Sequence, residues 1–113
     1  MPQEIVAELR RLTEEIRKGS SALYEAEVAL ANCENALDTI EQRAFIGAEG
    51  TVADRNALSR LEAADSRLQR DLARASVNRI KMKVKGLESA LMATQTMSRL
   101  MEMLLMIRRP PRK

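Results

Sequence analysis

The stretch "FIGAEGTVADRNAL", residues 45–58, contains the only strong turn signal in the chain. Gly47 and Gly50 bracket the turn, and glycine is the usual residue just past a helix end. Thr51 can cap a following helix, and Asp54, three residues later, can complete a capping box. The stretch therefore predicts the end of one helix and the start of the next.

The composition on both sides of this turn favours helices throughout. Aromatic residues make up 2% of the 113 residues, and there are 4 glycines and 3 prolines. The common residues are strong helix formers. We predict an all-α chain in which residues 1–107 form one antiparallel, coiled-coil-like helical hairpin. It consists of a helix at about 3–46, a turn at 47–51, a helix at about 52–107, and then a basic, proline-containing tail at 108–113.

The first predicted helix carries a heptad repeat. Residues suited to a buried seam recur at alternating steps of four and three, which is typical of a coiled coil. The sequence around Gly19 and Ser21 could break a helix, but the repeat keeps its phase there, so we expect one helix. The predicted seam residues are Ile5, Leu9, Leu12, Ile16, Gly19, Leu23, Ala26, Leu30, Cys33, Leu37, Ile40 and Ala44.

The second predicted helix has a less regular apolar stripe. The phase of the stripe slips between Ala75 and Ile80. The mean apolar repeat is therefore nearer to 3.6 than to 3.5 residues per turn, and we expect this helix to supercoil less regularly than the first. The predicted stripe residues are Leu58, Leu61, Leu68, Leu72, Ile80, Val84, Leu87, Leu91, Met101 and Leu105.

Folding the chain at the turn predicts which residues face each other. An antiparallel pair centred on the turn places Leu30 opposite Leu68. It also places Glu34 beside residues 61–67. The first helix then ends opposite about residue 95, so the second helix overhangs from Met97 onward. A two-helix seam buries little apolar surface, and we therefore expect self-association into a helical bundle.

The predicted overhang is apolar on nearly every side and is the candidate partner or oligomer interface. We expect a second copy of the chain to bury it, in a homodimer or larger assembly. The alternatives are a groove on another protein and a membrane surface, although Glu102 interrupts the apolar segment. The candidate interface residues are Met97, Leu100, Met101, Met103, Leu104, Leu105, Met106 and Ile107.

The sequence contains no recognisable active site. It has no histidine, which excludes histidine-based catalysis and the usual histidine metal sites. The single cysteine, Cys33, lies in the predicted seam and is expected to be an inert thiol. Neither a glycine-rich phosphate loop nor an apolar run of membrane-spanning length is present. We therefore predict a non-enzymatic, cytoplasmic protein with no cofactor, no metal and no membrane span.

Basic residues in the second half form the other candidate surface. The net charge is +3, but the first half is acidic and the second half basic. Arg60, Arg67, Arg74 and Lys81 recur every seven residues. They can pair with Glu34 and its heptad neighbours on the first helix, or follow a phosphate backbone. The candidate nucleic-acid contacts are Arg79, Lys81, Lys83, Lys85, Arg108, Arg109, Arg112 and Lys113.

The segments "EGTVADRNAL" and "KGLESALMATQTMSRLM" resemble small helical proteins of double-stranded DNA phages and prophages. The residues that carry the resemblance are Gly50, Thr51, Ala53, Arg55, Ala57, Lys85, Leu87, Leu91, Gln95 and Ser98. The resemblance implies a phage accessory protein but no mechanism. Together with the predicted architecture, it leads us to expect a phage accessory or host-directed interaction protein that binds a host or phage protein, in the host cytoplasm if the chain is phage-encoded. A nucleic-acid-binding accessory factor of recombination or replication and a structural phage component are the alternatives.

Overall fold

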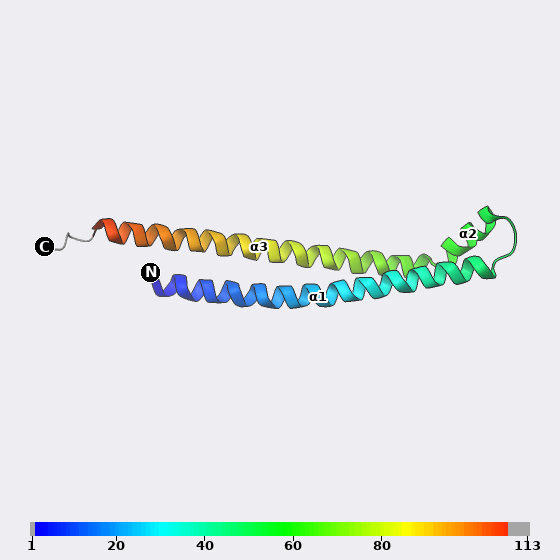
Figure 1. Cartoon of the computed structure of the whole chain (residues 1–113), viewed down its shortest axis with the longest axis horizontal. Helices are drawn as coiled ribbons and strands as arrows, with labels where there is room; N and C mark the ends of the chain where they lie inside the picture. The colour runs from blue at the N-terminus through cyan, green and yellow to red at the C-terminus, as the bar shows by residue number, and fades with distance from the viewer. Residues whose placement is uncertain (1, 109–113) are drawn as a thin grey trace. The chain divides into compact units, whose positions relative to one another are not determined.

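The computed structural model describes residues 2–108, and this part of the chain is all-α, as predicted. It contains α1 (Pro2–Gly47), α2 (Val52–Glu62) and α3 (Ala64–Arg108) (Figure 1). The prediction of two helices is wrong, because the second one is divided at Ala63.

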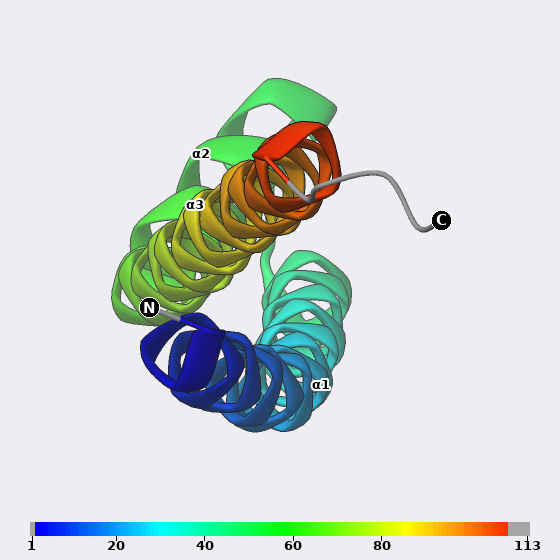
Figure 2. The same cartoon turned by 90° about the vertical axis from the view of Figure 1, so that its left-hand side faces the viewer.

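The helices contribute to two compact units. The turn unit comprises residues 22–81, and the terminal unit comprises residues 1–21 together with 82–113. In the terminal unit, the start of α1, drawn in blue, runs beside the yellow-to-orange part of α3, and the red end of α3 extends past it (Figures 1 and 2). In the turn unit, the end of α1 runs antiparallel to α2 and the start of α3.

Helix α1 is continuous through Gly19 and Ser21, as the unbroken heptad phase predicts. Each of its twelve predicted seam residues is buried or half-buried, and Leu12 and Leu37 are the most deeply buried. Gly19 belongs to this seam because α3 approaches it closely. A Cβ atom at Gly19 would lie 2.8 Å from a methyl carbon of Val84.

The turn at 48–51 is built as its sequence predicts. Gly50 has a φ of 108°, a conformation that favours glycine. The Thr51 hydroxyl accepts a hydrogen bond from the Asp54 backbone N–H at 3.2 Å, and the Thr51 N–H donates to the Asp54 carboxylate at 3.4 Å. The predicted capping box is confirmed.

The division between α2 and α3 is a bend at Ala63 and not a second turn. Ala63 has φ −87° and ψ 2°. Its N–H still donates to the Ser59 carbonyl at 3.1 Å, and its carbonyl accepts from the Arg67 N–H at 2.9 Å. Both join an N–H to the carbonyl four residues earlier, which is the hydrogen-bond pattern of an α-helix. The helix axis therefore changes direction while these backbone hydrogen bonds are kept.

The predicted stripe of α2 and α3 is wrong in its first half. Four of its leucines, Leu58, Leu61, Leu68 and Leu72, are exposed, and so is Leu105. The residues that face α1 are mostly smaller, and they follow a strict heptad repeat without the predicted slip. In the turn unit these residues are Ser59, Ala63, Ser66, Arg70, Ala73, Val77 and Ile80, and in the terminal unit they are Val84, Leu87, Leu91, Thr94, Ser98 and Met101.

The predicted register between the helices is wrong at Glu34. This residue pairs with Arg74 instead of lying beside residues 61–67. At Glu34 the pairing is thus displaced along α3 by seven residues from Arg67 to Arg74, which is about two helical turns. Nearer the turn, Glu41 pairs with Arg67 and its carbonyl accepts a hydrogen bond from the Ser59 hydroxyl. The error arises because small residues, and not the leucines, set the line of closest approach to α1.

Candidate interaction surfaces

The end of α3 in the terminal unit is an exposed apolar surface. Of the eight predicted interface residues, Met101 is half-buried and the other seven are exposed by 54–76%. Met101 is the last seam residue of α3, and residues 102–107 are all exposed. The overhang therefore begins at Glu102 and not at Met97, because the corrected register lets α1 cover more of α3.

Five of the six residues in this overhang are large and apolar. They are Met103, Leu104, Leu105, Met106 and Ile107, and Glu102 is the single charged residue among them. Successive residues point about 100° apart around an α-helix. Five adjacent apolar residues therefore surround the helix, and burying one side of it would leave others exposed.

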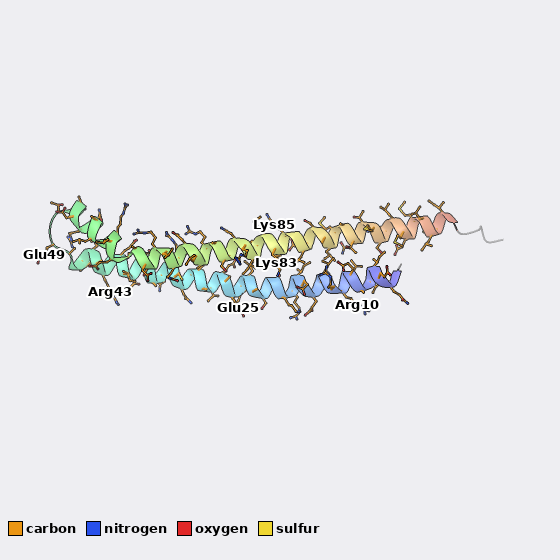
Figure 3. All side chains as sticks on the ribbon, turned by 180° about the vertical axis from the view of Figure 1, so that it is seen from behind. Arg10, Glu25, Arg43, Glu49, Lys83 and Lys85 are labelled. Atoms are coloured by element: carbon orange, nitrogen blue, oxygen red, sulfur yellow. The ribbon has the colours of Figure 1, made fainter. Side chains whose placement is uncertain are left out.

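The candidate nucleic-acid contacts do not form a single face. Arg79 and Lys81, in the turn unit, are exposed, as are Lys83 and Lys85 in the terminal unit. Residues two apart in sequence are related by a rotation of about 200° around the helix axis, so their side chains lie on nearly opposite sides of the helix. Figure 3 shows this for Lys83 and Lys85, which leave α3 on different sides.

The remaining predicted nucleic-acid contacts lie at the end of the chain. Arg108 is the last residue of α3, and Arg109, Arg112 and Lys113 lie outside the described residues. Of the predicted basic tail at 108–113, Arg108 is the one residue within the part of the chain that the structure describes.

Two of the heptad-spaced arginines pair with glutamates of α1. Arg67 lies 3.5 Å from Glu41 and Arg74 lies 3.6 Å from Glu34. Two successive rungs spaced by seven residues on both helices form a ladder across the turn unit. The ion-pair interpretation of these two arginines is confirmed, and it leaves their guanidinium groups less available for phosphate.

Arg55 makes a structural contact at the turn that the sequence analysis did not predict. Its Nε donates to the Phe45 carbonyl at 3.0 Å, and its guanidinium carbon lies 4.4 Å from the centre of the Phe45 ring. Phe45 is in the last turn of α1, where carbonyls lack partners within the helix. The last turn of α1 has no basic residue of its own. The lack of a basic residue at this helix end is the sequence signal that could have predicted capping by a basic side chain of another helix.

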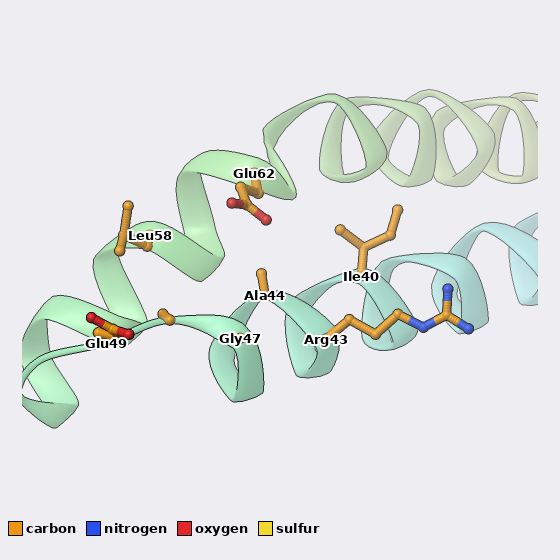
Figure 4. A pocket seen from close by; sticks show the side chains of 8 residues that line it. Ile40, Arg43, Ala44, Gly47, Glu49, Leu58 and Glu62 are labelled. Carbon is orange, nitrogen blue, oxygen red and sulfur yellow. The ribbon is translucent and has the colours of Figure 1, made fainter.

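A shallow hollow of about 530 Å³ lies between α1 and α2 in the turn unit. Figure 4 shows Ile40 and Ala44 on α1, with Leu58 and Glu62 on α2, around this hollow. The residues combine apolar side chains with isolated charges. This arrangement provides no nucleophile and base within reach of each other, which covalent catalysis requires.

The turn unit also has an exposed apolar surface, which is formed by leucines that the sequence analysis had assigned to the buried stripe. Leu61, at the end of α2, and Leu68 and Leu72, on α3, are exposed by 54–73%. We call these three residues, with exposed Ala75, the outer leucine stripe. Their spacing of three, four and seven residues places them on one side of the helix, roughly opposite the residues that face α1.

Ionisable groups with a perturbed pKa occur at the exposed start of α1. The Arg11 guanidinium hydrogen-bonds to Glu8 and lowers the pKa of that carboxyl, and Arg17 lowers the pKa of Glu14 in the same way. Both pairs are three residues apart within one helix. They support the helix and show no feature of an acid–base site.

The described residues also bear on metal binding, on thiol chemistry and on membrane insertion. Among them, no group of three or more histidine, cysteine or acidic side chains could hold a metal ion. Cys33 is a free, half-buried thiol in the α1 seam. No helix in this part of the chain is long and apolar enough to cross a membrane.

Comparison with known proteins adds no further assignment. The chain matches no family model, no curated protein and no solved structure. The resemblance to phage helical proteins stays a prediction.

Proposed function

We propose that this chain is a non-enzymatic interaction protein, built as a helical hairpin, that buries the end of α3 against another macromolecule. The observation that carries the proposal is the exposure of residues 102–107, five of which are large and apolar. Contiguous exposed apolar surface of this kind is typical of protein–protein interaction sites.

The side chains at this end suit a helical partner. Met103 and Met106 are unbranched and adapt to irregular surfaces. Leu104, Leu105 and Ile107 supply branched side chains that pack between the ridges of a second helix. A groove between two or more helices would cover most of this end at once.

A second copy of the chain is the partner that we propose first. The residues of α2 and α3 that face α1 include Ser59, Ser66 and Ala73, whose side chains bury little apolar area. A helical pair with so thin a seam gains stability when another pair covers its exposed apolar residues, as in a four-helix bundle.

The resemblance to phage proteins supports a more specific version of this proposal. In that version the chain is a phage accessory or host-directed protein, and a host or phage protein takes the place of the second copy. A structural phage component is the alternative. In either case α3 would be recognised through the same apolar residues.

The Leu104→Asp/Leu105→Asp double variant tests the proposal. We expect the parent to have at least twice the 12.7 kDa chain mass by light scattering at micromolar concentration. The mass of the variant should fall to half that of the parent or less, because each buried carboxylate would lack a partner.

The control is the Tyr24→Asp/Ile46→Asp double variant, which changes two other exposed apolar side chains. It should keep the mass of the parent. A helical Leu104→Asp/Leu105→Asp variant with unchanged mass would show that the end of α3 is not an interface.

Nucleic-acid binding is the second candidate function. Arg79, Lys81, Lys83 and Lys85 are exposed, and none of the ion pairs within residues 2–108 includes them. If the chain binds duplex DNA, the Lys83→Gln/Lys85→Gln variant should reduce the slope of log affinity against log salt by about 2. An unchanged slope would remove these two lysines from the contact.

A further inference from the structure

The outer leucine stripe forms a heptad pattern of its own on α3. Leu68, Leu72 and Ala75 follow each other at steps of four and three, and Asp65 and Arg79 continue the same steps at the two ends. All five residues are exposed. A stripe that repeats every seven residues matches the seam of a second helix in a coiled coil.

The two charged ends determine which partner helix would fit. Asp65 is in the first turn of α3, and Arg79 lies about four helical turns further along. Neither residue takes part in any ion pair within the described part of the chain. The stripe thus presents two leucines and an alanine between a free carboxylate and a free guanidinium.

A second copy of α3 complements this pattern in only one direction. In a parallel pair, Asp65 would face Asp65 and Arg79 would face Arg79, and like charges opposite each other are destabilising. In an antiparallel pair, the acidic end of each copy meets the basic end of the other. The stripe is therefore complementary to itself when one copy is reversed.

We propose that the outer leucine stripe binds a second copy of this chain in an antiparallel arrangement around a two-fold axis beside residues 68–72. Leu68 of each copy packs against Leu72 of the other. Asp65 of each copy lies within about one helical turn of Arg79 of the other, a distance that the long arginine side chain spans. Such a two-fold contact uses the same patch on both copies.

This inference concerns a surface of the turn unit and does not depend on the end of α3. The two interfaces can therefore be separated by mutation. The test is carried out in the Leu104→Asp/Leu105→Asp background, which removes the interface of the proposed function and leaves the outer leucine stripe unchanged.

Charge reversal at the two ends tests the antiparallel pairing. We expect a small interface of this kind to have a weak affinity. Sedimentation equilibrium of the background chain should therefore be carried out at a high concentration, about 100 µM, where it should show a dimer. Asp65→Arg and Arg79→Asp should each weaken that dimer by about tenfold, because each places like charges opposite each other twice. Circular dichroism of each variant confirms that the helices are retained.

Mixing the two single variants provides the decisive result. One chain then carries two positive ends and the other two negative ends, so both charge pairs are attractive in the heterodimer. An equimolar mixture, and the Asp65→Arg/Arg79→Asp double variant alone, should regain the parent affinity. A folding defect in either single variant would not be repaired by mixing.

Three results would overturn the proposal. They are a background chain that stays monomeric at this concentration, single variants that dimerise as well as the background, and a mixture no tighter than its components. Failure of the proposed function has a different signature, since the Leu104→Asp/Leu105→Asp change itself would then leave the mass of the parent unaltered.

Discussion

Arg55 contacts Phe45 in two ways, through a 3.0 Å hydrogen bond to its carbonyl and through a guanidinium 4.4 Å from its ring. The contact joins the first turns of α2 to the last turn of α1 across the four-residue connection. A positive charge at the carboxyl end of a helix also interacts favourably with the helix dipole. Arg55 therefore acts as the C-terminal cap that the sequence of α1 lacks.

Replacing Arg55 should measurably destabilise the turn unit. We expect Arg55→Ala to lower the free energy of unfolding by about 1–2 kcal/mol, since the carbonyl cap and the cation–π contact are both lost. Phe45→Leu, which removes only the ring, should cost less than Arg55→Ala. Urea unfolding followed by circular dichroism measures both, and equal stability of Arg55→Ala and the parent would contradict the cap.

Two helical glycines should respond in opposite ways to alanine. At Gly19 the new Cβ would lie 2.8 Å from Val84, so we expect Gly19→Ala to destabilise by about 1 kcal/mol, because crowding exceeds the gain in helix propensity. No atom lies within 4 Å of a Cβ at Gly86, so Gly86→Ala should stabilise by about 0.5–1 kcal/mol. Denaturant unfolding of both variants tests the difference. The double variant Gly19→Ala/Val84→Ala should lose less stability than the sum of its two single variants, because the smaller side chain at position 84 relieves the crowding.

Enlarging a seam alanine should distinguish the observed seam from the predicted one. Ala63 is completely buried, whereas its neighbour Ala64 is exposed. Ala63→Leu should therefore cost about 1–3 kcal/mol through overpacking, and Ala64→Leu should change the stability by less than about 0.5 kcal/mol. Comparable thermal unfolding of the two variants would show that the seam follows another line.

The ladder in the turn unit should contribute a small, salt-sensitive coupling. Both partners of the Glu34–Arg74 pair are about half exposed, and pairs of this kind contribute about 0.2–1 kcal/mol. A double-mutant cycle with Glu34→Gln and Arg74→Gln should give a coupling in this range that falls as salt is added. A coupling that is insensitive to salt would indicate a different kind of contact.

The start of α1 should lose support in acid. The pKa of Glu8 is lowered by its hydrogen bond with Arg11, so its ionised form is favoured in the folded chain. The stabilisation is present above the ordinary glutamate pKa of about 4.3 and is lost as the pH falls through the lowered value. An NMR titration should show Glu8 titrating at lower pH in the parent than in Arg11→Gln, and identical titrations would exclude the pair in solution.

The sequence predicted α1 and the turn well because both carry local signals. The heptad of α1 includes bulky residues such as Leu12 and Leu37, which are the residues that become buried. The capping box of Thr51 and Asp54 depends on four consecutive residues and needs no tertiary information. These are the features for which spacing and residue type together leave one interpretation.

Prediction failed for α2 and α3 because residue size was taken as a guide to burial. Leu68 and Leu72 are exposed, while Ala63 and Ser59 are buried. Ser59 can be buried because its hydroxyl donates to the Glu41 carbonyl at 2.8 Å, which satisfies the polar group. Two competing heptad lines run along α3, and only the close approach of α1 determines which line faces inward.

The candidate surfaces likewise include features that the sequence predicts and features that depend on how the helices pack. The apolar end of α3 was readable from composition alone, although its starting residue depended on the register. The separation of Lys83 from Lys85 around the helix follows from their spacing, and reading the basic residues as one cluster overlooked it. The outer leucine stripe could be recognised as a surface only once the true seam was known.

The contacts that stabilise the turn unit also suggest an order of folding. Arg55 and Phe45 are 10 residues apart in sequence, and Ser59 and Glu41 are 18 apart, so these contacts close short loops at low entropic cost. The Glu41–Arg67 and Glu34–Arg74 rungs close progressively longer ones. Helix pairing should therefore begin at the turn and proceed away from it, and proteins dominated by such local contacts fold rapidly. The exposed apolar end of α3 follows the turn unit in the chain, so the residues of the turn unit emerge during synthesis and are available to pair before it.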